Sequence, residues 1–371
     1  MIEPIAVIGA GNGGTAIAAH ILNKDGSVNL CDLFPDYLRD IQEQGYINLN
    51  YQDKSIKVKP ALVTTDMKEA IKGVKLIMIV TPAFTHKLIA EACSQYLEDE
   101  QVIVLNPGRT GGALEFLNTV RKLGCNKDIV VAEAQTLIYS CRKTDGNSVN
   151  IYGKKKSVDI SCIPNTRIND VVELLSPYYS QFKPVPDVAW TSFANIGSMF
   201  HPTPMLLNMG RIENDNRGFK YYWEGISPSV ADMIEIIDKE RVNVANAFGA
   251  EVLSAKEWLM QSYNTYGDTL HERIINNKAY GDINAPTNIQ VRYVTEDVPT
   301  GLVPISELGR VADISTPNID AVIRLTSSLY RTNFREIGRS LKNLGINNMQ
   351  KDEIMSYFKT GKIKELKGEL I

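Results

Sequence analysis

The stretch IAVIGAGNGGTAIAAH, residues 5–20, decides the fold of the N-terminal part of this chain. A short β-branched strand leads directly into Gly9-x-Gly11-x-x-Gly14, and an alanine-rich segment typical of a helix follows. In this pattern Gly9 permits a tight turn, Gly11 lets backbone approach a phosphate, and Gly14 lets the helix pack on the strand. Because the N-terminus of the helix also offers free N–H groups, the loop predicts a dinucleotide-binding site.

An acidic residue ends the second expected strand, which covers residues 27–32. Asp32 follows Gly14 by 18 residues, where a carboxylate is expected to accept a hydrogen bond from a ribose 2′-hydroxyl. A 2′-phosphate would meet a like charge there, and residues 33–36 contain no arginine to offset it. We therefore expect NAD as the cofactor and leave NADP open, because Arg39 could still reach the site.

The first half of the chain alternates strand-like and helix-like segments, as a doubly wound parallel sheet requires. Further buried strands are expected at residues 75–80, 102–105 and 129–133. Their carboxyl ends should meet the glycine loop at one edge of the sheet, so the turns after them should line one crevice. The cofactor-binding residues predicted in this way are Gly9, Gly11, Asn12, Gly13, Gly14, Asp32, Thr81, Pro82, Asn106, Gly108 and Glu133.

Periodicity divides the chain into an α/β part and an all-α part. Within the first part, residues 47–63 predict an inserted hairpin and residues 148–164 have antiparallel character. We expect a Rossmann domain over residues 1–187 and a helical substrate domain over residues 188–371. In the helical domain we expect one long helix from Pro228 to Gly249 and another from Thr316 to near Gly345.

Composition excludes several classes of function. The chain has 371 residues, 40 Lys and Arg against 43 Asp and Glu, a net charge of −3 and no basic block longer than residues 154–156, so we expect no nucleic acid and no membrane as partner. Its apolar runs are far shorter than the ~20 residues that cross a bilayer, and no signal peptide precedes the first strand, which predicts a cytoplasmic protein. Five cysteines without a CxxC pair and four histidines without ligand spacing predict neither a disulfide framework nor a metal site.

One histidine in the second half stands in an unusual sequence context. His201 lies among apolar residues and directly before Pro202. Proline restricts the residue before it and lacks an N–H group, so His201 should lie at a break between two helical pieces, with its side chain able to face a cleft. A core histidine bonded to a neighbouring carbonyl is the alternative interpretation.

A second candidate segment, residues 290–302, supplies a guanidinium and two carboxylates. Reduction of a 2-oxo acid or its imine needs a planar donor for the carboxylate, an acid for the heteroatom, and a carboxylate that orients the acid. Arg292, His201 and Asp297 would fill these three catalytic roles in that order. A solvated surface turn is the alternative for this segment.

Together these motifs resemble the opine dehydrogenase family, which includes octopine and nopaline dehydrogenases and bacterial enzymes that form N-(1-carboxyethyl)norvaline. The resemblance implies a Rossmann domain joined to an all-helical domain. It also implies that His201 is the catalytic histidine, that Asp297 is its carboxylate partner, and that Arg292 holds the 2-oxo acid. Glu296, next to Asp297, could take the partner role instead. The segments that carry the resemblance are residues 9–14, 106–108, 133–142, 195–208, 292–302 and 316–320.

Such enzymes condense the amino group of an amino acid with a 2-oxo acid, commonly pyruvate, and reduce the imine with NAD(P)H. The resemblance therefore implies these two small molecules as partners, and a homodimer is left open. One alternative is a 2-oxo acid or 2-hydroxy acid dehydrogenase similar to ketopantoate reductase, and another is a non-catalytic NADH-sensing protein. Candidate pocket residues, each of which could equally be packing, are Cys141, Met205, Asn208, Tyr222, Trp223 and Trp258.

Overall fold

The computed structural model describes residues 3–215 and 217–362 of the chain. These form two compact units, one made of the residues up to Ser192 together with those from Ser356 onward, and one made of Phe193–Met355. The sequence predicted a boundary at residue 187 and a second domain that continues to the C-terminus. The chain instead returns to the first unit, where Lys359 approaches Asp187 and Gly361 lies against Ile163.

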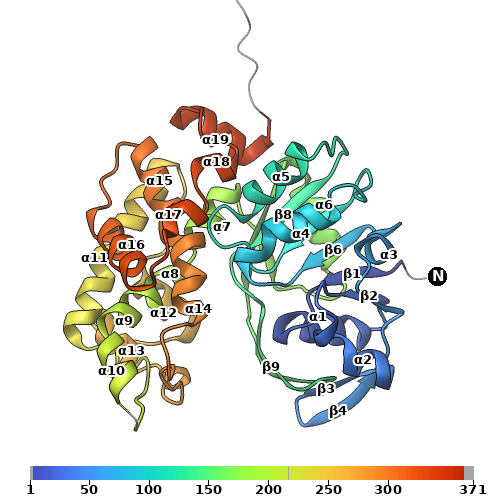
Figure 1. Cartoon of the computed structure of the whole chain (residues 1–371), viewed down its shortest axis with the longest axis horizontal. Coiled ribbons are helices and arrows are strands. Elements are labelled where there is room, and N and C mark those ends of the chain that lie inside the picture. The colour runs from blue at the N-terminus through green and yellow to red at the C-terminus, as the bar shows by residue number, and fades with distance from the viewer. Residues whose placement is uncertain (1–2, 216, 363–371) are drawn as a thin grey trace, which may run out of the picture. The chain divides into compact units, whose positions relative to one another are not determined.

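The first unit is built on an eight-stranded sheet in the order β12-β11-β8-β7-β6-β1-β2-β5 (Figure 1). The six strands from β8 to β5 run parallel, and β11 pairs antiparallel with β8. All carboxyl ends of these six strands therefore lie at one edge. The bounds are β1 (Ile5–Ile8), β2 (Val28–Cys31), β5 (Leu62–Thr64), β6 (Leu76–Ile79), β7 (Val102–Leu105), β8 (Val130–Ala134), β11 (Val158–Ile163) and β12 (Phe182–Pro184).

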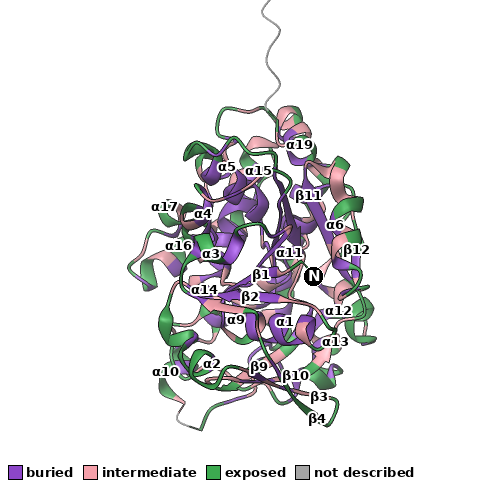
Figure 2. Cartoon of the chain, turned by 90° about the vertical axis from the view of Figure 1, so that its right-hand side faces the viewer, coloured by how far each residue is buried: buried purple, intermediate pink, exposed green. Residues whose placement is uncertain are grey.

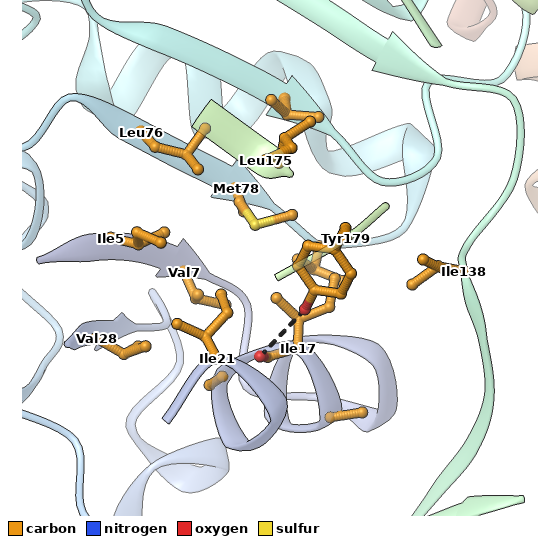
Figure 3. Packing of buried hydrophobic residues seen from close by; sticks show 14 of the residues in the cluster. Ile5, Val7, Ile17, Ile21, Val28, Leu76, Met78, Ile138, Leu175 and Tyr179 are labelled. Atoms are coloured by element: carbon orange, nitrogen blue, oxygen red, sulfur yellow. Dashed lines mark hydrogen bonds between the residues drawn. The ribbon is translucent and has the colours of Figure 1, made fainter. Parts of the chain in front are cut away.

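Helices connect the parallel strands and bury the apolar sheet. Figure 2 shows the central strands of this sheet as buried, and every residue of β1, β2, β6, β7 and β8 is buried, as the near-continuous apolar sequence of a parallel sheet requires. Close by, Ile17 and Ile21 of α1 pack with residues of β1, β2 and β6, and the Tyr179 hydroxyl donates to the Ile17 carbonyl at 3.4 Å (Figure 3). The helices of this unit are α1 (Asn12–Leu22), α2 (Arg39–Gln44), α3 (Met67–Ile71), α4 (His86–Cys93), α5 (Gly112–Lys122) and α6 (Ile168–Leu175). The boundaries between the two units fall within α7 (Val188–Phe193) and α19 (Lys351–Thr360).

A second, four-stranded sheet packs on α1, in the order β4-β3-β10-β9. It contains β3 (Ile47–Tyr51), β4 (Lys54–Val58), β9 (Tyr139–Asp145) and β10 (Ser148–Lys154). The predicted hairpin is present as β3 and β4, but β3 also pairs parallel with β10, about 100 residues away, with Asn48 opposite Ser148. Residues 62 and 63, which the sequence placed in the hairpin, belong to β5 of the main sheet instead.

The second unit is built of helices, so the fold class predicted from the sequence is confirmed. The long predicted helix is α11, which Ser227 caps and Pro228 begins. Its buried Glu240 accepts hydrogen bonds from the backbone N–H groups of Asn318 and Ile319 at the start of α16. The unit contains α8 (Gly197–Phe200), α9 (Pro202–Leu207), α10 (Met209–Asn214), α11 (Pro228–Ala247), α12 (Ala255–Tyr263), α13 (Leu270–Ile275), α14 (Arg292–Thr295), α15 (Val303–Val311), α16 (Pro317–Leu329), α17 (Phe334–Ile337) and α18 (Leu341–Leu344).

The single helix predicted from Thr316 to near Gly345 is wrong, because this segment forms α16, α17 and α18. The chain leaves α16 at Arg331, whose left-handed φ of 52° ends an α-helix. This turn buries Phe334, while Ile337, which the periodicity placed on the buried face, is 62% exposed. None of the helices among the described residues has the length and apolar character that a membrane crossing requires.

Candidate active site

The glycine loop between β1 and α1 has the geometry of a phosphate cradle. Gly9 has a φ of +108°, and a side chain on it would come within 2.7 Å of the Val80 carbonyl oxygen. A Cβ on Gly14 would lie 1.7 Å from the Gly9 carbonyl oxygen, so only glycine allows α1 to approach the turn this closely. A Cβ on Gly11 would meet no described atom within 4 Å, and no side chain from the described part of the chain caps α1. The open space and the uncapped N–H groups fit a dinucleotide diphosphate.

Asp32 at the end of β2 contacts the glycine loop directly. Its Oδ2 accepts a hydrogen bond from the Ala10 N–H at 2.7 Å, and its Oδ1 accepts one from the Phe34 N–H at 3.0 Å. Each carboxylate oxygen has more than one acceptor direction, so a ribose hydroxyl can still bond to it. Arg39, the arginine that could have changed the cofactor preference, pairs on the exposed surface with Asp36.

The other predicted cofactor residues lie at neighbouring strand ends. Thr81 and Pro82 follow β6, and Asn106 and Gly108 follow β7. Backbone hydrogen bonds from Val80 to Ile8 and from Asn106 to Ile79, both 2.8 Å, continue the parallel register to this edge. The Asn106 Oδ1 atom is buried and has no hydrogen-bond partner among the described residues. Such an atom is a candidate acceptor for a ligand, which again fits a bound nucleotide.

Glu133 lies in the same region but is fully buried. Its carboxylate accepts hydrogen bonds from the Thr191 and Ser192 hydroxyls at 2.7 and 2.6 Å and from the Ala113 N–H at 2.8 Å. A Cβ on Gly108 would lie 2.5 Å from the Glu133 Cβ, so the two residues pack together. These contacts support a role in which Glu133 holds the loop after β7 and the start of α5.

In the second unit, His201 lies between α8, which ends at Phe200, and α9, which begins at Pro202, so the predicted helix break is confirmed. The His201 N–H still donates to the Gly197 carbonyl at 3.1 Å, and its carbonyl accepts from Met205. Proline at the first position of α9 costs no helical hydrogen bond. The chain therefore bends at His201, and backbone hydrogen bonds still connect this residue to α8 and to α9.

His201 and Asp297 form a direct pair although 96 residues separate them. The His201 Nδ1 lies 2.8 Å from Asp297 Oδ2, and the exposed fractions of the two side chains are 18% and 2%. Asp297 immediately precedes a π-helical turn, Val298–Leu302, a feature that often occurs at functional sites. A buried carboxylate on Nδ1 keeps the proton on that nitrogen and leaves Nε2 for chemistry.

The neighbouring Glu296 has a different partner. Its Oε2 accepts a hydrogen bond from Arg292 Nε at 2.7 Å, one helical turn earlier in the chain. The sequence had left open whether Glu296 or Asp297 pairs with His201, and the structure assigns Asp297 to the histidine and Glu296 to the arginine. The Arg292 side chain remains 60% exposed. Since a guanidinium carries five N–H bonds, Arg292 can still offer donors to an incoming carboxylate.

Three tyrosines complete the surroundings of His201. The Tyr222 hydroxyl lies 3.3 Å from His201 Nε2, and the Tyr221 hydroxyl donates to the His201 carbonyl at 2.9 Å. The Tyr293 ring stacks on the imidazole with a centroid distance of 4.2 Å and an interplanar angle of 11°. Burial raises the pKa of the Tyr222 phenol well above its usual value, so the hydroxyl keeps its proton. Tyr280 stacks on Tyr222 at 4.0 Å and fixes that ring in turn.

The sequence named Tyr222 only as a candidate pocket residue and named neither Tyr221 nor Tyr293. The run of aromatic residues 221–223 and the position of Tyr293 beside Arg292 were the available signals. Among the described residues, His, Cys, Asp and Glu form no group of three or more that could hold a metal ion.

The comparisons with known proteins cover both units. Residues 4–131 match the family described as NAD-dependent glycerol-3-phosphate dehydrogenase N-terminus. Residues 184–330 match the family described as NAD/NADP octopine/nopaline dehydrogenase, alpha-helical domain. In solved structures, octopine dehydrogenase with NADH and L-arginine aligns with a TM-score of 0.82 at 22% identity, covering 97% of this chain and 98% of that chain. NADP⁺-bound yersinopine dehydrogenase aligns with a TM-score of 0.72 at 12% identity, covering 96% and 98%.

Similarity to curated proteins extends over nearly the whole chain. It is 25% identical over 365 residues to an octopine dehydrogenase of Mizuhopecten yessoensis, covering 87% of this chain and 89% of that protein. It is 39% identical over 344 residues to an opine dehydrogenase of Arthrobacter sp. (strain 1C), covering 93% of this chain and 95% of that protein. With this identity over both units, the chain belongs to the opine dehydrogenase family.

Proposed function

We propose that this protein is an NAD(P)H-dependent opine dehydrogenase, which joins an amino acid and a 2-oxo acid, with pyruvate as the expected oxo acid, into a secondary amine dicarboxylate. The observation that carries the proposal is the 2.8 Å contact between His201 Nδ1 and the buried Asp297 carboxylate, in a chain whose other unit holds a dinucleotide loop. The names of the relatives agree with it, since they include opine and octopine dehydrogenases.

The residues proposed to hold the cofactor are those at the carboxyl edge of the parallel sheet. The glycine loop would bind the diphosphate through backbone N–H groups, and Asp32 would bind a ribose hydroxyl. Asn106 Oδ1, buried and without a partner in the described chain, would accept a hydrogen bond from the nucleotide. When bound, NADH supplies the hydride that reduces the imine carbon.

His201 is proposed to act as the general acid. The amine attacks the 2-oxo carbonyl and gives a carbinolamine, which must lose its hydroxyl before reduction. With Nδ1–H donating to Asp297, the protonated imidazole carries its other proton on Nε2 and gives it to that hydroxyl. The hydroxyl leaves as water with the C–O electron pair, while the nitrogen lone pair forms the C=N bond. Asp297 stabilises the imidazolium and fixes its orientation through Nδ1.

Arg292 and Tyr222 have supporting roles in this proposal. Arg292, held by Glu296, would bind the carboxylate of the 2-oxo acid through the N–H groups that Glu296 does not use. Tyr222 bonds to Nε2 of His201 and would hold that nitrogen in the site until a substrate oxygen approaches it. The cytoplasmic location expected from the sequence stays a prediction.

A matrix of substrates tests the proposal. NADH oxidation is measured with several 2-oxo acids, each against all the proteinogenic amino acids and against no amine. The expected result is turnover that requires both an oxo acid and a particular set of amino acids. Turnover with the oxo acid alone would identify a 2-oxo acid reductase, and NADH binding without turnover in any combination would identify a non-catalytic nucleotide sensor. Either result would overturn the proposal.

A further inference from the structure

One lysine of the basic block 154–156 is turned toward the first unit. Lys155 lies between β10 and β11, and its ammonium donates a hydrogen bond to the Leu137 carbonyl at 2.8 Å. Its backbone N–H donates to the Ile138 carbonyl at 2.9 Å, so its main chain and its side chain both bond to the segment that follows β8. Lys156, the next residue, is exposed. The side chain of Lys155 is therefore held in place, unlike that of its neighbour.

Lys155 lies at the carboxyl edge of the main sheet, beside the start of α1. A Cβ on Gly13 would come within 3.1 Å of the Leu137 side chain, whose carbonyl holds the ammonium. Cys141, a second neighbour of the lysine, donates from Sγ to the carbonyl of the first residue of α1 at 3.4 Å, and Figure 1 shows β9, which carries it, running beside α1. In the sheet β7 and β8 lie on one side of β1, and β2 lies on the other. Since Asp32 after β2 is expected at the adenosine ribose, Lys155 lies on the side expected for the nicotinamide.

No carboxylate of the described chain forms an ion pair with Lys155. Burial, the largest effect, and the positive charge of Arg109 lower the pKa of the ammonium to about 8, while Cys141 has an opposing effect. An ammonium has three N–H bonds, and the Leu137 carbonyl accounts for one of them. Burial removes water from the charge, and the nearest guanidinium repels it. A bound anion would therefore stabilise this ammonium, because it would supply the missing countercharge and accept the remaining N–H bonds.

The proposed reaction brings such an anion to the nicotinamide. Its product is a secondary amine with two carboxylates, and Arg292 is assigned to the carboxylate that comes from the 2-oxo acid. The other carboxylate comes from the amino acid and is attached to the carbon next to the imine nitrogen. Since hydride passes directly from the nicotinamide to the imine carbon, the carboxylate of the amino acid, a few bonds from that carbon, must lie near the nicotinamide.

We infer that Lys155 binds the α-carboxylate of the amino acid substrate. The inference rests on the proposed function and deepens it, because it assigns the second carboxylate of the product to a second cation. A guanidinium would then recognise the 2-oxo acid, and an ammonium of the nucleotide-binding unit would recognise the amino acid. Amines that lack the carboxylate should be poor substrates.

Steady-state kinetics of the full-length chain test the inference. With an amino acid found active in the substrate matrix, the KM of the amino acid, the KM of the 2-oxo acid and the NADH dissociation constant are measured for each variant. Lys155→Met is expected to raise the KM of the amino acid about tenfold or more and to change the other two constants by less than about threefold. Lys155→Arg should retain most of the affinity, because it keeps a cation that binds carboxylates. Lys156→Met is the matched control, since it removes the neighbouring exposed lysine, and it should change none of the three constants.

Replacing the amino acid by its primary amide distinguishes a carboxylate contact from a structural role. The amide should lower kcat/KM about tenfold or more with the wild-type enzyme and less than about threefold with Lys155→Met, because the variant has already lost the contact. Equal losses with the two enzymes would overturn the inference. A rise in the NADH dissociation constant as large as the rise in the KM of the amino acid would overturn it too, because Lys155 would then act on the nucleotide or on the segment after β8.

A third variant removes the charge and keeps a donor. Lys155→Gln can still donate to the Leu137 carbonyl, so it gives the same two comparisons if Lys155→Met does not fold. Wild-type enzyme without turnover for any amino acid would contradict the proposed function. Turnover that requires an amino acid but shows no dependence on Lys155 would contradict this inference alone.

Discussion

The glycine loop of the first unit and the His201 region of the second unit are built from different parts of the chain. The loop depends on backbone within one short segment, where Gly9, Gly11 and Gly14 leave room for a turn, a ligand and a close helix. The His201 region depends on side chains that meet from distant segments, since Asp297 and Tyr222 lie 96 and 21 residues away. Added side-chain bulk should therefore impair the glycine loop, whereas removal of a single polar atom should impair the His201 region.

The largest effect is expected from removal of the imidazole. His201→Asn should lower kcat by roughly 10² to 10⁴, the usual contribution of a general acid, and leave the NADH dissociation constant unchanged. Stopped-flow turnover and NADH fluorescence measure the two quantities. A histidine needed only for packing would instead lower the thermal unfolding midpoint and leave the kcat of the folded fraction intact.

Substitutions of the two adjacent acids, Asp297 and Glu296, can be compared with His201→Asn. Asp297→Asn should lower kcat as His201→Asn does, because it removes the charge that stabilises the imidazolium. Glu296→Gln should mainly raise the KM of the 2-oxo acid through Arg292. If Glu296→Gln gave the larger loss of kcat, the pairing of His201 with Asp297 would not be the one used in the reaction.

In the glycine loop, two substitutions of the same size should act differently. Gly14→Ala places a Cβ 1.7 Å from the Gly9 carbonyl and should lower the free energy of unfolding by about 1–3 kcal/mol or more. Gly11→Ala meets no described atom within 4 Å and has a negative φ of −77°, so the unfolding midpoint should not change. Gly11→Ala should nevertheless raise the dissociation constant of NADH by about tenfold or more, since the methyl group enters the space assigned to the diphosphate.

Thermal unfolding without nucleotide and NADH titration distinguish these two glycine variants. If folded Gly11→Ala bound NADH as tightly as wild type, the diphosphate would not lie against Gly11. Unchanged stability of Gly14→Ala would show that α1 can move away from the turn.

A smaller effect is expected at Arg292, whose planar guanidinium is proposed to bind a carboxylate. Arg292→Lys keeps the charge and loses the two-bond geometry, so the KM of the 2-oxo acid should rise about tenfold while NADH binding is constant. Replacing the carboxylate of the oxo acid by an amide should raise KM by a larger factor with the wild-type enzyme than with Arg292→Lys. Simple additivity of the two losses would show that the arginine and the carboxylate do not meet.

The smallest effect is expected at Tyr222, which offers one neutral hydrogen bond to His201 Nε2. Tyr222→Phe keeps the ring that stacks on Tyr280, so it should lower kcat about two- to tenfold, as loss of ~0.5–1.5 kcal/mol implies, and change the pH profile of kcat. Tyr280→Phe retains the same stacking and should leave that profile unchanged. If the pH profile of Tyr222→Phe were identical to that of wild type, the role of Tyr222 would be packing alone.

Much of the first unit follows from local patterns in the sequence. The parallel strands are buried apolar runs ended by turn residues, and the glycine loop has a strict spacing, so both were predictable. The pairing of β3 with β10 was not predictable, because it joins segments about 100 residues apart and no local pattern in the sequence marks it.

In the second unit the sequence pointed to His201, Arg292 and Asp297 as candidate catalytic residues through their residue types and the family resemblance. It favoured Asp297 as the partner of His201 but left Glu296 as an alternative, because the pairing depends on the rotation of the short turn between α14 and the π-helical turn. The end of α16 was missed for a related reason. A left-handed residue such as Arg331 stops a helix without glycine or proline to mark the position.

The identity of the product distinguishes reductive condensation from simple reduction of the 2-oxo acid. The enzyme is supplied with NADH, pyruvate and an ¹⁵N-labelled amino acid found active in the substrate matrix, and the products are analysed by mass spectrometry. The proposed reaction gives one product that contains the carbon atoms of both substrates, retains the ¹⁵N label, and forms in a one-to-one ratio with oxidised NADH. A 2-hydroxy acid without nitrogen, formed in the same ratio, would contradict it.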